Sequence, residues 1–155
     1  MAQINWACLL LGSNIYPQEN IAQALVELNK YLKIKGTSSS YWSKAVGSDG
    51  PDFINAAVLI ESEKDLKFIE EKILAPIENK LGRIRTDDKN SPRTIDIDVI
   101  IYNDTLLDDS LFKYSHIAVP VAELLPDYLS KEGESLKSVA ISLMREVPVW
   151  GKDSL

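Results

Sequence analysis

The order of hydrophobic and polar positions in the first 60 residues predicts a strand, a helix and two further strands. The run 4–11 is almost wholly apolar, which is typical of a buried strand. Apolar residues then recur at helical spacing and predict an amphipathic helix over 18–32. The stretch 34–42 is rich in Ser, Thr and aromatic residues and predicts an edge strand, and the apolar run 53–60 predicts a second buried strand.

The second half of the chain predicts a further helix, a further strand and a last helix. Apolar residues at helical spacing over 66–81 predict a second helix, which Pro76 should kink or restart. Alternating β-branched residues predict a third buried strand over 94–102, followed by a short apolar stretch at 119–125 and a last helix at 136–144. The resulting βαββαβ order predicts an α+β fold, a ferredoxin-like sandwich with helices packed on one face of the sheet and extra C-terminal elements.

The composition is typical of a globular protein of the cytoplasm. The 155 residues suit a single domain spanning 1–155, and no apolar run approaches the roughly 18 residues that cross a bilayer. The only cysteine, Cys8, lies in an apolar run, so we expect a buried thiol in a reducing compartment. The net charge of −6 argues against general nucleic-acid binding. We therefore expect small-molecule partners, no nucleic acid, no membrane and, for the oligomeric state, a monomer.

Asp96 and Asp98 form the first candidate functional feature. Because they lie two apart on a predicted strand, their carboxylates should share one face while Ile95, Ile97 and Val99 share the other. Two neighbouring carboxylates repel each other unless a cation lies between them, and hard oxygen ligands close to phosphate suit Mg²⁺. The pair is therefore a candidate metal site, and the alternative is a solvent-exposed strand face.

A local basic patch precedes this pair in a chain that is acidic overall. The stretch 80–93 contains five basic residues and two acidic ones. Arginine side chains bind phosphate oxygens in pairs, so the patch suits a compact polyanion such as a nucleoside triphosphate, although ordinary surface salt bridges are the alternative. Its basic residues are Lys80, Arg83, Arg85, Lys89 and Arg93.

Two other features leave alternatives open. The glycine spacing fits neither a P-loop nor a dinucleotide-binding loop, so another phosphate cradle is required. The tripeptide at 12–14, Gly-Ser-Asn, either lines the site or forms a plain turn. His116 is the only histidine and is either an ordinary surface or core residue or a contact to the ligand.

Four segments, in order, resemble the hydroxymethyldihydropterin pyrophosphokinases of folate synthesis. They are L-G-S-N at 11–14, P-D-F-I-N-A-A-V at 51–58, I-E-x-x-L-G-R-x-R at 77–85 and P-R-T-I-D-I-D-V-I at 92–100. The resemblance covers roughly residues 4–104 and implies a ferredoxin-like fold. It also implies Mg²⁺-dependent transfer of the pyrophosphate of ATP to the hydroxymethyl group of 6-hydroxymethyl-7,8-dihydropterin, with release of AMP.

The resemblance further implies roles for single residues. Two Mg²⁺ ions are expected to bridge Asp96, Asp98 and the ATP phosphates, with Arg83 and Arg93 completing the catalytic set. Nucleotide contacts are implied for Glu78, Arg83, Arg85, Lys89, Arg93 and Val99. Pterin contacts are implied for Ser43, Val46, Phe53, Asn55 and His116.

Three positions depart from the family pattern. Lys89-Asn90 replaces an Arg-Trp pair, Ala75 replaces a glutamine, and the segment that ends at His116 is shortened. These departures leave, as an alternative, a catalytically weak or inactive paralogue that binds pterin or nucleotide. A third possibility is a ferredoxin-like interaction module, which has no reason to place two acids on a strand face opposite an arginine cluster.

Overall fold

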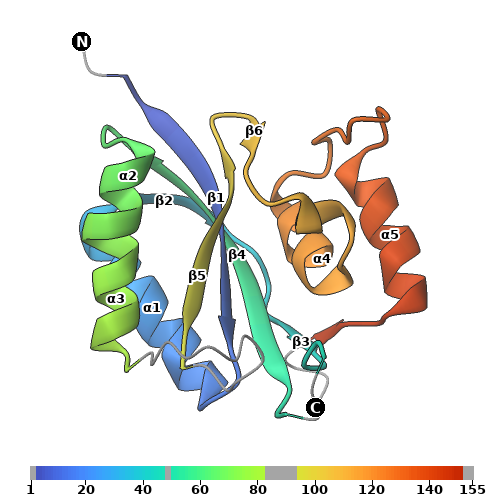
Figure 1. The fold of residues 1–155 in the computed structure, drawn as a ribbon, viewed down its shortest axis with the longest axis horizontal. Coiled ribbons are helices and arrows are strands. Elements are labelled where there is room, and N and C mark those ends of the chain that lie inside the picture. Colours follow the sequence, from blue (N-terminus) through green and yellow to red (C-terminus); the bar gives the residue numbers. More distant parts are fainter. Residues whose placement is uncertain (1–2, 48–49, 83–93, 152–155) are drawn as a thin grey trace.

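The computed structural model describes residues 3–47, 50–82 and 94–151 and has three layers (Figure 1). Within these residues, seven antiparallel strands form one sheet in the order β6-β5-β1-β4-β3-β7, with β2 paired to β4. The strands are β1 (Asn5–Ser13), β2 (Lys33–Thr37), β3 (Tyr41–Ser43), β4 (Phe53–Ser62), β5 (Asp96–Tyr102), β6 (Thr105–Leu106) and β7 (Trp150–Gly151).

Helices cover both faces of this sheet. On one face lie α1 (Pro17–Tyr31) and a continuous helical segment made of α2 (Leu66–Phe68), the π-helical turn η1 (Ile69–Leu74) and α3 (Ala75–Lys80). On the other face lie the 3₁₀ turn η2 (Asp109–Phe112), α4 (Ser115–Leu124) and α5 (Leu136–Glu146). Within the described residues, no helix combines the length and the apolar character needed to cross a membrane.

The central strand β1 separates two hydrophobic cores because its side chains alternate between the faces of the sheet. Leu9 and Leu11 belong to the core under α1 and α3, whereas Cys8 and Leu10 belong to the core under α4 and α5. Cys8 is fully buried, as predicted, and this burial raises the pKa of its thiol to about 12. An apolar run of this kind is required of any strand that is covered on both faces.

The βαββαβ order and the ferredoxin-like class are confirmed, and the strand order β5-β1-β4-β2 is that of this fold. The helices of the core motif cover one face, as predicted. The extra C-terminal elements cover the other face, which the sequence pattern did not predict. The segment around 119–125, predicted only as apolar, is the helix α4.

The predicted strand at 34–42 and the predicted helix at 66–81 both change along their length. The stretch predicted as one edge strand over 34–42 is interrupted between β2 and β3, where the Ser38 hydroxyl accepts a hydrogen bond from the Ala57 backbone N–H at 2.8 Å. The helix predicted over 66–81 does change at Pro76. The π-helical turn comes directly before it, which accommodates a residue without an N–H donor.

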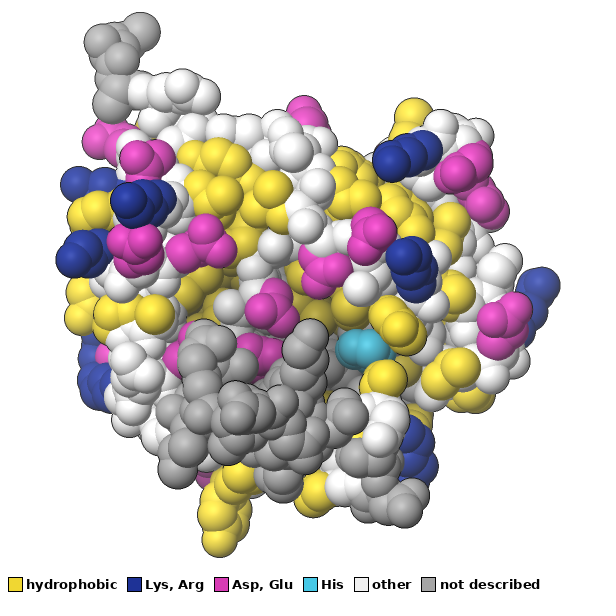
Figure 2. Space-filling model, in the orientation of Figure 1, with side chains coloured by type: hydrophobic (Ala, Val, Ile, Leu, Met, Phe, Trp, Pro, Cys, Tyr) yellow, Lys and Arg dark blue, Asp and Glu magenta, His cyan; other side chains and the backbone are white. Residues whose placement is uncertain are grey.

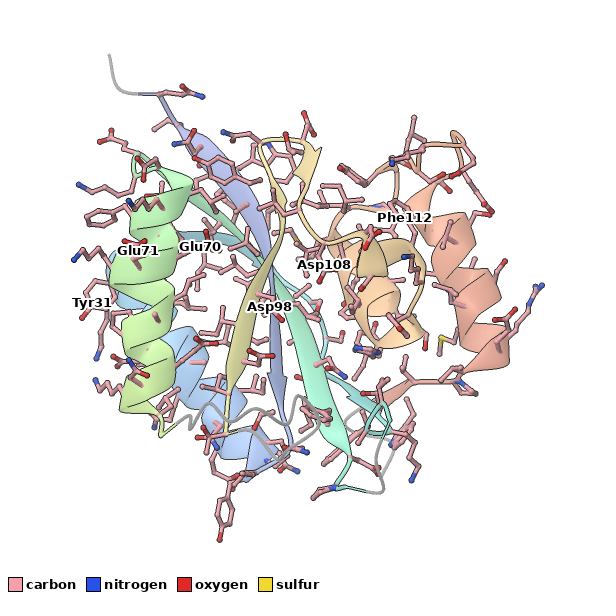
Figure 3. All side chains as sticks on the ribbon, viewed as in Figure 1. Tyr31, Glu70, Glu71, Asp98, Asp108 and Phe112 are labelled. Carbon is pink, nitrogen blue, oxygen red and sulfur yellow. The ribbon has the colours of Figure 1, made fainter. Side chains whose placement is uncertain are left out.

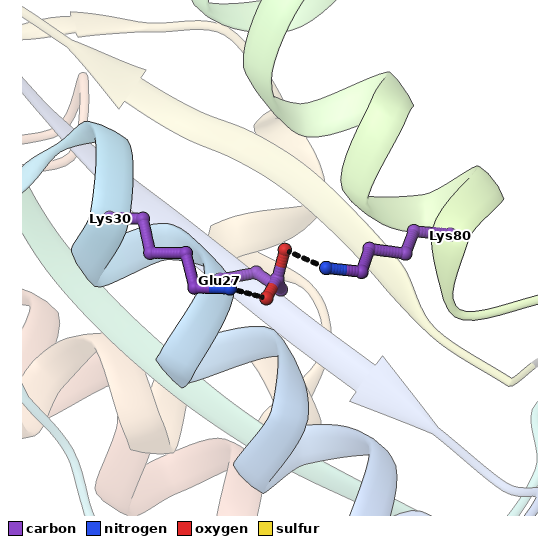
Figure 4. A network of polar contacts seen from close by, with 3 residues as sticks. All are labelled: Glu27, Lys30 and Lys80. Carbon is purple, nitrogen blue, oxygen red and sulfur yellow. Dashed lines mark hydrogen bonds and ion pairs between the residues drawn. The ribbon is translucent and has the colours of Figure 1, made fainter.

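A buried carboxylate connects the two helices on the first face (Figure 4). Glu27 of α1 accepts hydrogen bonds from Lys30 at 2.5 Å and from Lys80 of α3 at 2.8 Å. The hydrogen bond from Lys30, followed by that from Lys80, lowers the pKa of Glu27 below its usual value. Lys80, counted above in the basic patch, thus pairs with α1.

This pairing predicts a pH-dependent contribution to stability. Since the pKa of Glu27 is lowered in the folded protein, its stabilising effect is fully present above the usual carboxyl pKa and is lost as the pH falls through the lowered value. We therefore expect Glu27→Gln to be less stable than the parent at pH 7 and nearly as stable at pH 3. Urea unfolding at both pH values checks this, with Glu132→Gln on an exposed loop as the control. A constant difference between parent and Glu27→Gln across this range would contradict the prediction.

Candidate functional site

Three neighbouring strands bring the predicted metal and pterin residues into one row. In the register of the sheet, Gly12 of β1 lies opposite Asp96 of β5 on one side and opposite Asn55 of β4 on the other. Adjacent strands are about 4.8 Å apart, so the backbones of Asp96 and Asn55 are separated by about 10 Å. The next row on the same face holds Asp98 opposite Leu10. The glycine therefore lies midway between the acid and the amide.

The two aspartates share one face of β5, as predicted. Both line the two cavities described below, while Ile95, Ile97 and Val99 belong to the core under α1 and α3. Figure 3 shows Asp98 on β5 between the two helical layers. Burial of the isoleucine face thus fixes the direction of both carboxylates.

A larger cavity of about 780 Å³ extends across β5 at the two aspartates, with lining residues from η1 and α3 on one side and from η2 and α4 on the other. Its walls include Glu78 and Val99, two of the residues expected to contact the nucleotide. Glu70 and Asp108 also line it from different elements, and acidic side chains gather over the centre of this face (Figures 2 and 3). The remaining described lining residues are Val46, Leu74, Ala75, Asp96, Ile97, Asp98, Ser110, Tyr114, His116 and Ile117.

Glu78 has a defined structural contact beside this cavity. It is buried on α3, and its Oε2 atom accepts a hydrogen bond from the Ile97 backbone N–H at 2.9 Å. Ile97 separates the two aspartates, so this bond holds the acid-bearing part of β5 against α3.

We expect Glu78→Ala to lower the free energy of unfolding by about 1–3 kcal/mol, because it leaves the buried Ile97 N–H without this acceptor. Glu78→Gln keeps a carbonyl oxygen at the same place, so its free energy of unfolding should fall clearly less. Urea denaturation of the two variants measures the difference. If both variants lost the same free energy of unfolding, the hydrogen bond to the Ile97 N–H would not be the cause of the loss.

A smaller cavity of about 170 Å³ lies on the β3 and β4 side of the aspartates. All five residues expected to contact the pterin line it: Ser43, Val46, Phe53, Asn55 and His116. The floor is Gly12, where an added Cβ would lie 3.5 Å from Asn55 Oδ1 and 3.9 Å from a ring carbon of Phe53. Gly12, the glycine of the Gly-Ser-Asn tripeptide, thus lies within β1 and lines this cavity, and the alternative of a plain turn is wrong for it.

His116 lies in the first turn of α4 and lines both cavities. Its ring centroid is 5.6 Å from that of Tyr114, with the planes tilted by 40°. Burial lowers the pKa of His116 below its usual value, and the negative charge of Asp108 partly opposes this shift. The side chain therefore favours the neutral, flat imidazole, which suits packing against a ring.

The two cavities meet at a shared wall. This wall contains Asp96 and Asp98, together with Val46, His116 and Ile117. A ligand in the larger cavity and a ligand in the smaller one would both reach the carboxylates. The geometry suits transfer of a group from one ligand to the other next to paired acids.

Four predicted residues, Arg83, Arg85, Lys89 and Arg93, lie outside the described residues. Among the described residues, no group of three or more His, Cys, Asp or Glu side chains could hold a metal ion.

Sequence reasoning did not single out Glu70 or Asp108 as lining residues. Glu70, Leu74 and Glu78 are spaced by four residues and all three line the larger cavity, so this spacing was the sequence signal available for Glu70. Asp108 carried no such signal, because its position depends on how the segment after β6 packs against α4.

Solved structures share this fold. The structure matches Plasmodium falciparum HPPK-DHPS solved with pteroate, with a TM-score of 0.73 and 14% sequence identity over 94% of this chain and 44% of that chain. It also matches wild-type HPPK-DHPS of the same organism with a TM-score of 0.72. The chain spans less than half the length of these proteins and shares the fold of the part that it covers.

The sequence then identifies the family. The model of the 7,8-dihydro-6-hydroxymethylpterin-pyrophosphokinase (HPPK) family matches residues 8–126, and the chain belongs to this family. A Synechocystis protein named 2-amino-4-hydroxy-6-hydroxymethyldihydropteridine pyrophosphokinase is 35% identical over 96% of this chain and 80% of its own length. A protein of the same name from Methylorubrum extorquens is 32% identical over 88% of this chain and 92% of its own length. Another from Pseudomonas aeruginosa is 30% identical over 81% of this chain and 84% of its own length.

Proposed function

We propose that this protein transfers the pyrophosphate of ATP to the hydroxymethyl group of 6-hydroxymethyl-7,8-dihydropterin and releases AMP. Membership of the family and relatives at 30–35% identity over most of the chain support this reaction. The structural observation that carries it is the shared wall, where Asp96 and Asp98 lie between a large and a small cavity. The comparisons lend no support to the alternative of an inactive paralogue.

The larger cavity is the proposed ATP site. Glu78 and Val99 would contact the nucleotide from α3 and β5, and Arg83, Arg85, Lys89 and Arg93 would supply the cations that its phosphates require. Arg83 and Arg93 would stabilise negative charge on the transferred group, whereas Asp96 and Asp98 would act through the metal ions that they hold.

Asp96 and Asp98 are the proposed ligands of two Mg²⁺ ions. Their oxygen donors fit, since Mg²⁺ is commonly held by one or two carboxylates and completed by substrate phosphates and water. Bound Mg²⁺ would neutralise phosphate charge during transfer. The chain's own contribution is to hold both carboxylates on one face of β5, on the wall that both substrates reach.

The smaller cavity is the proposed pterin site. Phe53 and His116 offer flat surfaces to the ring, Val46 offers an apolar contact, and Ser43 and Asn55 offer polar atoms. The separation of about 10 Å between the Asn55 and Asp96 backbones is enough for a bicyclic ring whose hydroxymethyl group is directed at the acids. Positioning of the two substrates would supply most of the rate enhancement.

We also propose that residues 1–155 act as one pyrophosphokinase domain, as a monomer and in the cytoplasm. The single, buried cysteine suits a reducing compartment. Light scattering coupled to gel filtration tests the oligomeric state.

The decisive assay mixes the protein with Mg²⁺, ATP and hydroxymethyldihydropterin and measures AMP by chromatography. AMP should form only when all three are present. If no AMP appears above background while the pterin still binds, the enzyme is excluded and the binding paralogue is favoured.

A further inference from the structure

We propose that the segment after α5, residues 147–151, is a positioning element that joins two walls of the smaller cavity and sets their separation. One wall continues from β3 and contains Lys44 and Val46, and the other is the start of α4 with His116. The inference rests on the proposed pterin site and deepens it, because it names residues that determine how wide the site is. The family model matches residues 8–126, so this segment lies beyond the matched part of the chain.

The first contact holds the segment to α4. Ser115, the first residue of α4, is 3% exposed, and its hydroxyl donates a hydrogen bond to the Val147 backbone carbonyl at 2.5 Å. Ser115 directly precedes His116, which lines the smaller cavity. The buried side chain of Val149 anchors the same segment in the protein. The wall that contains His116 is therefore connected to the end of α5.

The second contact holds the segment to β3. Trp150 and Gly151 form β7, which pairs with β3 so that Trp150 lies opposite Trp42. The strand β3 has only three residues and pairs with β4 on its other side, so β7 makes it an internal strand of the sheet. Any shift of β3 would therefore break strand pairing on both of its sides.

Lys44 extends this contact to the wall of the cavity. Its Nζ atom lies 5.9 Å from the centroid of the Trp150 ring and 3.3 Å from Asp52 Oδ1. A cation within roughly 6 Å of a tryptophan ring is attracted by the negative face of the ring. Lys44 directly follows β3 and lines the smaller cavity, so Trp150 and Asp52 restrain this part of the wall. Because the Lys44 side chain is 77% exposed, each contact is weak, and we expect a small factor in binding.

A third cavity lies where the two walls and the C-terminal segment meet. It has a volume of about 280 Å³, and Val147 lines it from the end of α5. Because this space lies between the walls, the segment that bridges it has a direct influence on their separation. The residues that line both the third cavity and the smaller cavity are Ser43, Lys44, Ala45, Val46 and His116.

A double-mutant cycle on Lys44 and Trp150 tests the proposal. The Kd for 6-hydroxymethylpterin is measured by isothermal titration calorimetry with saturating Mg²⁺ and α,β-methylene-ATP, an analogue that cannot transfer its pyrophosphate. We expect Lys44→Gln and Trp150→Ala each to raise this Kd about 2- to 5-fold, the range for one exposed cation–ring pair. The double variant should bind no more weakly than the weaker single variant, because both changes break the same contact. Lys44→Arg keeps the cation and should keep the parental Kd.

A direct contact between Lys44 and the ligand would give a different result. In that case Trp150→Ala alone would leave the Kd unchanged, or the two effects would multiply in the double variant, and either outcome would overturn the proposal. Lys64→Gln is the matched control and should keep the parental Kd. The Lys64 Nζ atom lies 4.8 Å from the centroid of the Phe68 ring, and neither residue is in the described lining of the smaller cavity.

Hydrogen–deuterium exchange of the protein without ligands separates this proposal from the proposed function. Trp150→Ala should speed the exchange of amides in 41–46 and leave the exchange of α1 unchanged. Unchanged exchange in 41–46, or an equal rise in both segments through a general loss of stability, would overturn the proposal. If exchange in 41–46 rose as expected but the parental protein bound no pterin, the proposed function would be refuted, and the segment would still be the connection between the two walls.

Discussion

Replacing Asp96 and Asp98 together by alanine is expected to lower kcat for AMP formation by about a thousandfold or more. The two carboxylates are the described acids on the wall that both cavities share, and loss of stabilisation at a developing charge typically costs a factor of about 100–1,000 per group. Steady-state rates at saturating Mg²⁺, ATP and pterin measure the effect.

The same double variant should remain folded and should still bind pterin. Both carboxylates project from the face of β5 opposite its buried isoleucines, so their removal opens no core. Asp127→Ala, on an exposed position away from the shared wall, is the matched control and should keep the parental rate. If the double variant kept its full rate, the metal assignment would be wrong.

Replacing Gly12 by valine is expected to raise the KM for pterin by roughly 10- to 100-fold, since overpacking costs about 1–3 kcal/mol. A Cβ at this position already reaches ordinary contact distance from Asn55 and Phe53, and the branched methyl groups would occupy the cavity floor. The KM for ATP should change little, because Gly12 is absent from the described lining of the larger cavity. Initial rates with each substrate varied separately measure this difference.

A second strand glycine provides the control for this substitution. An added Cβ on Gly36 of β2 would lie 3.5 Å from Leu124, the same distance as the shorter contact at Gly12, but Gly36 lines neither cavity. Gly36→Val should therefore lower stability without a selective rise in the KM for pterin. Equal changes in both KM values for Gly12→Val would argue against a pterin site at this place.

The parts of the fold that follow from strict periodicity were predictable from the sequence. The alternation in 94–102 placed the aspartates on one face and the isoleucines on the other, because one buried face determines the direction of every side chain in a strand. The helix at 18–32 and the strand at 53–60 followed from equally regular apolar spacing.

Weaker local patterns could not be resolved in the same way. The stretch 34–42 lacks a clear alternation, so its division into β2 and β3 depends on hydrogen bonds between Ser38 and β4. The helix α4 contains Pro120, which disfavours a helical interpretation, and tertiary packing against the sheet overrides this preference.

The site shows the same division between local and long-range information. Motif resemblance selected the residues predicted to contact the pterin, and these residues line one cavity. The row of Asp96, Gly12 and Asn55 joins three segments far apart in the sequence, so it depends on the register of two strand pairs and no local pattern contains it. Lys80 illustrates the limit of counting charges, because its partner Glu27 is 53 residues away.

The stoichiometry of the products tests the central claim most directly. A reaction with ATP labelled in the γ-phosphate and hydroxymethyldihydropterin should yield AMP and a labelled pterin diphosphate in equal amounts, as measured by chromatography and mass spectrometry. Formation of ADP with a pterin monophosphate, or release of AMP without a phosphorylated pterin, would contradict transfer of an intact pyrophosphate group between the two cavities.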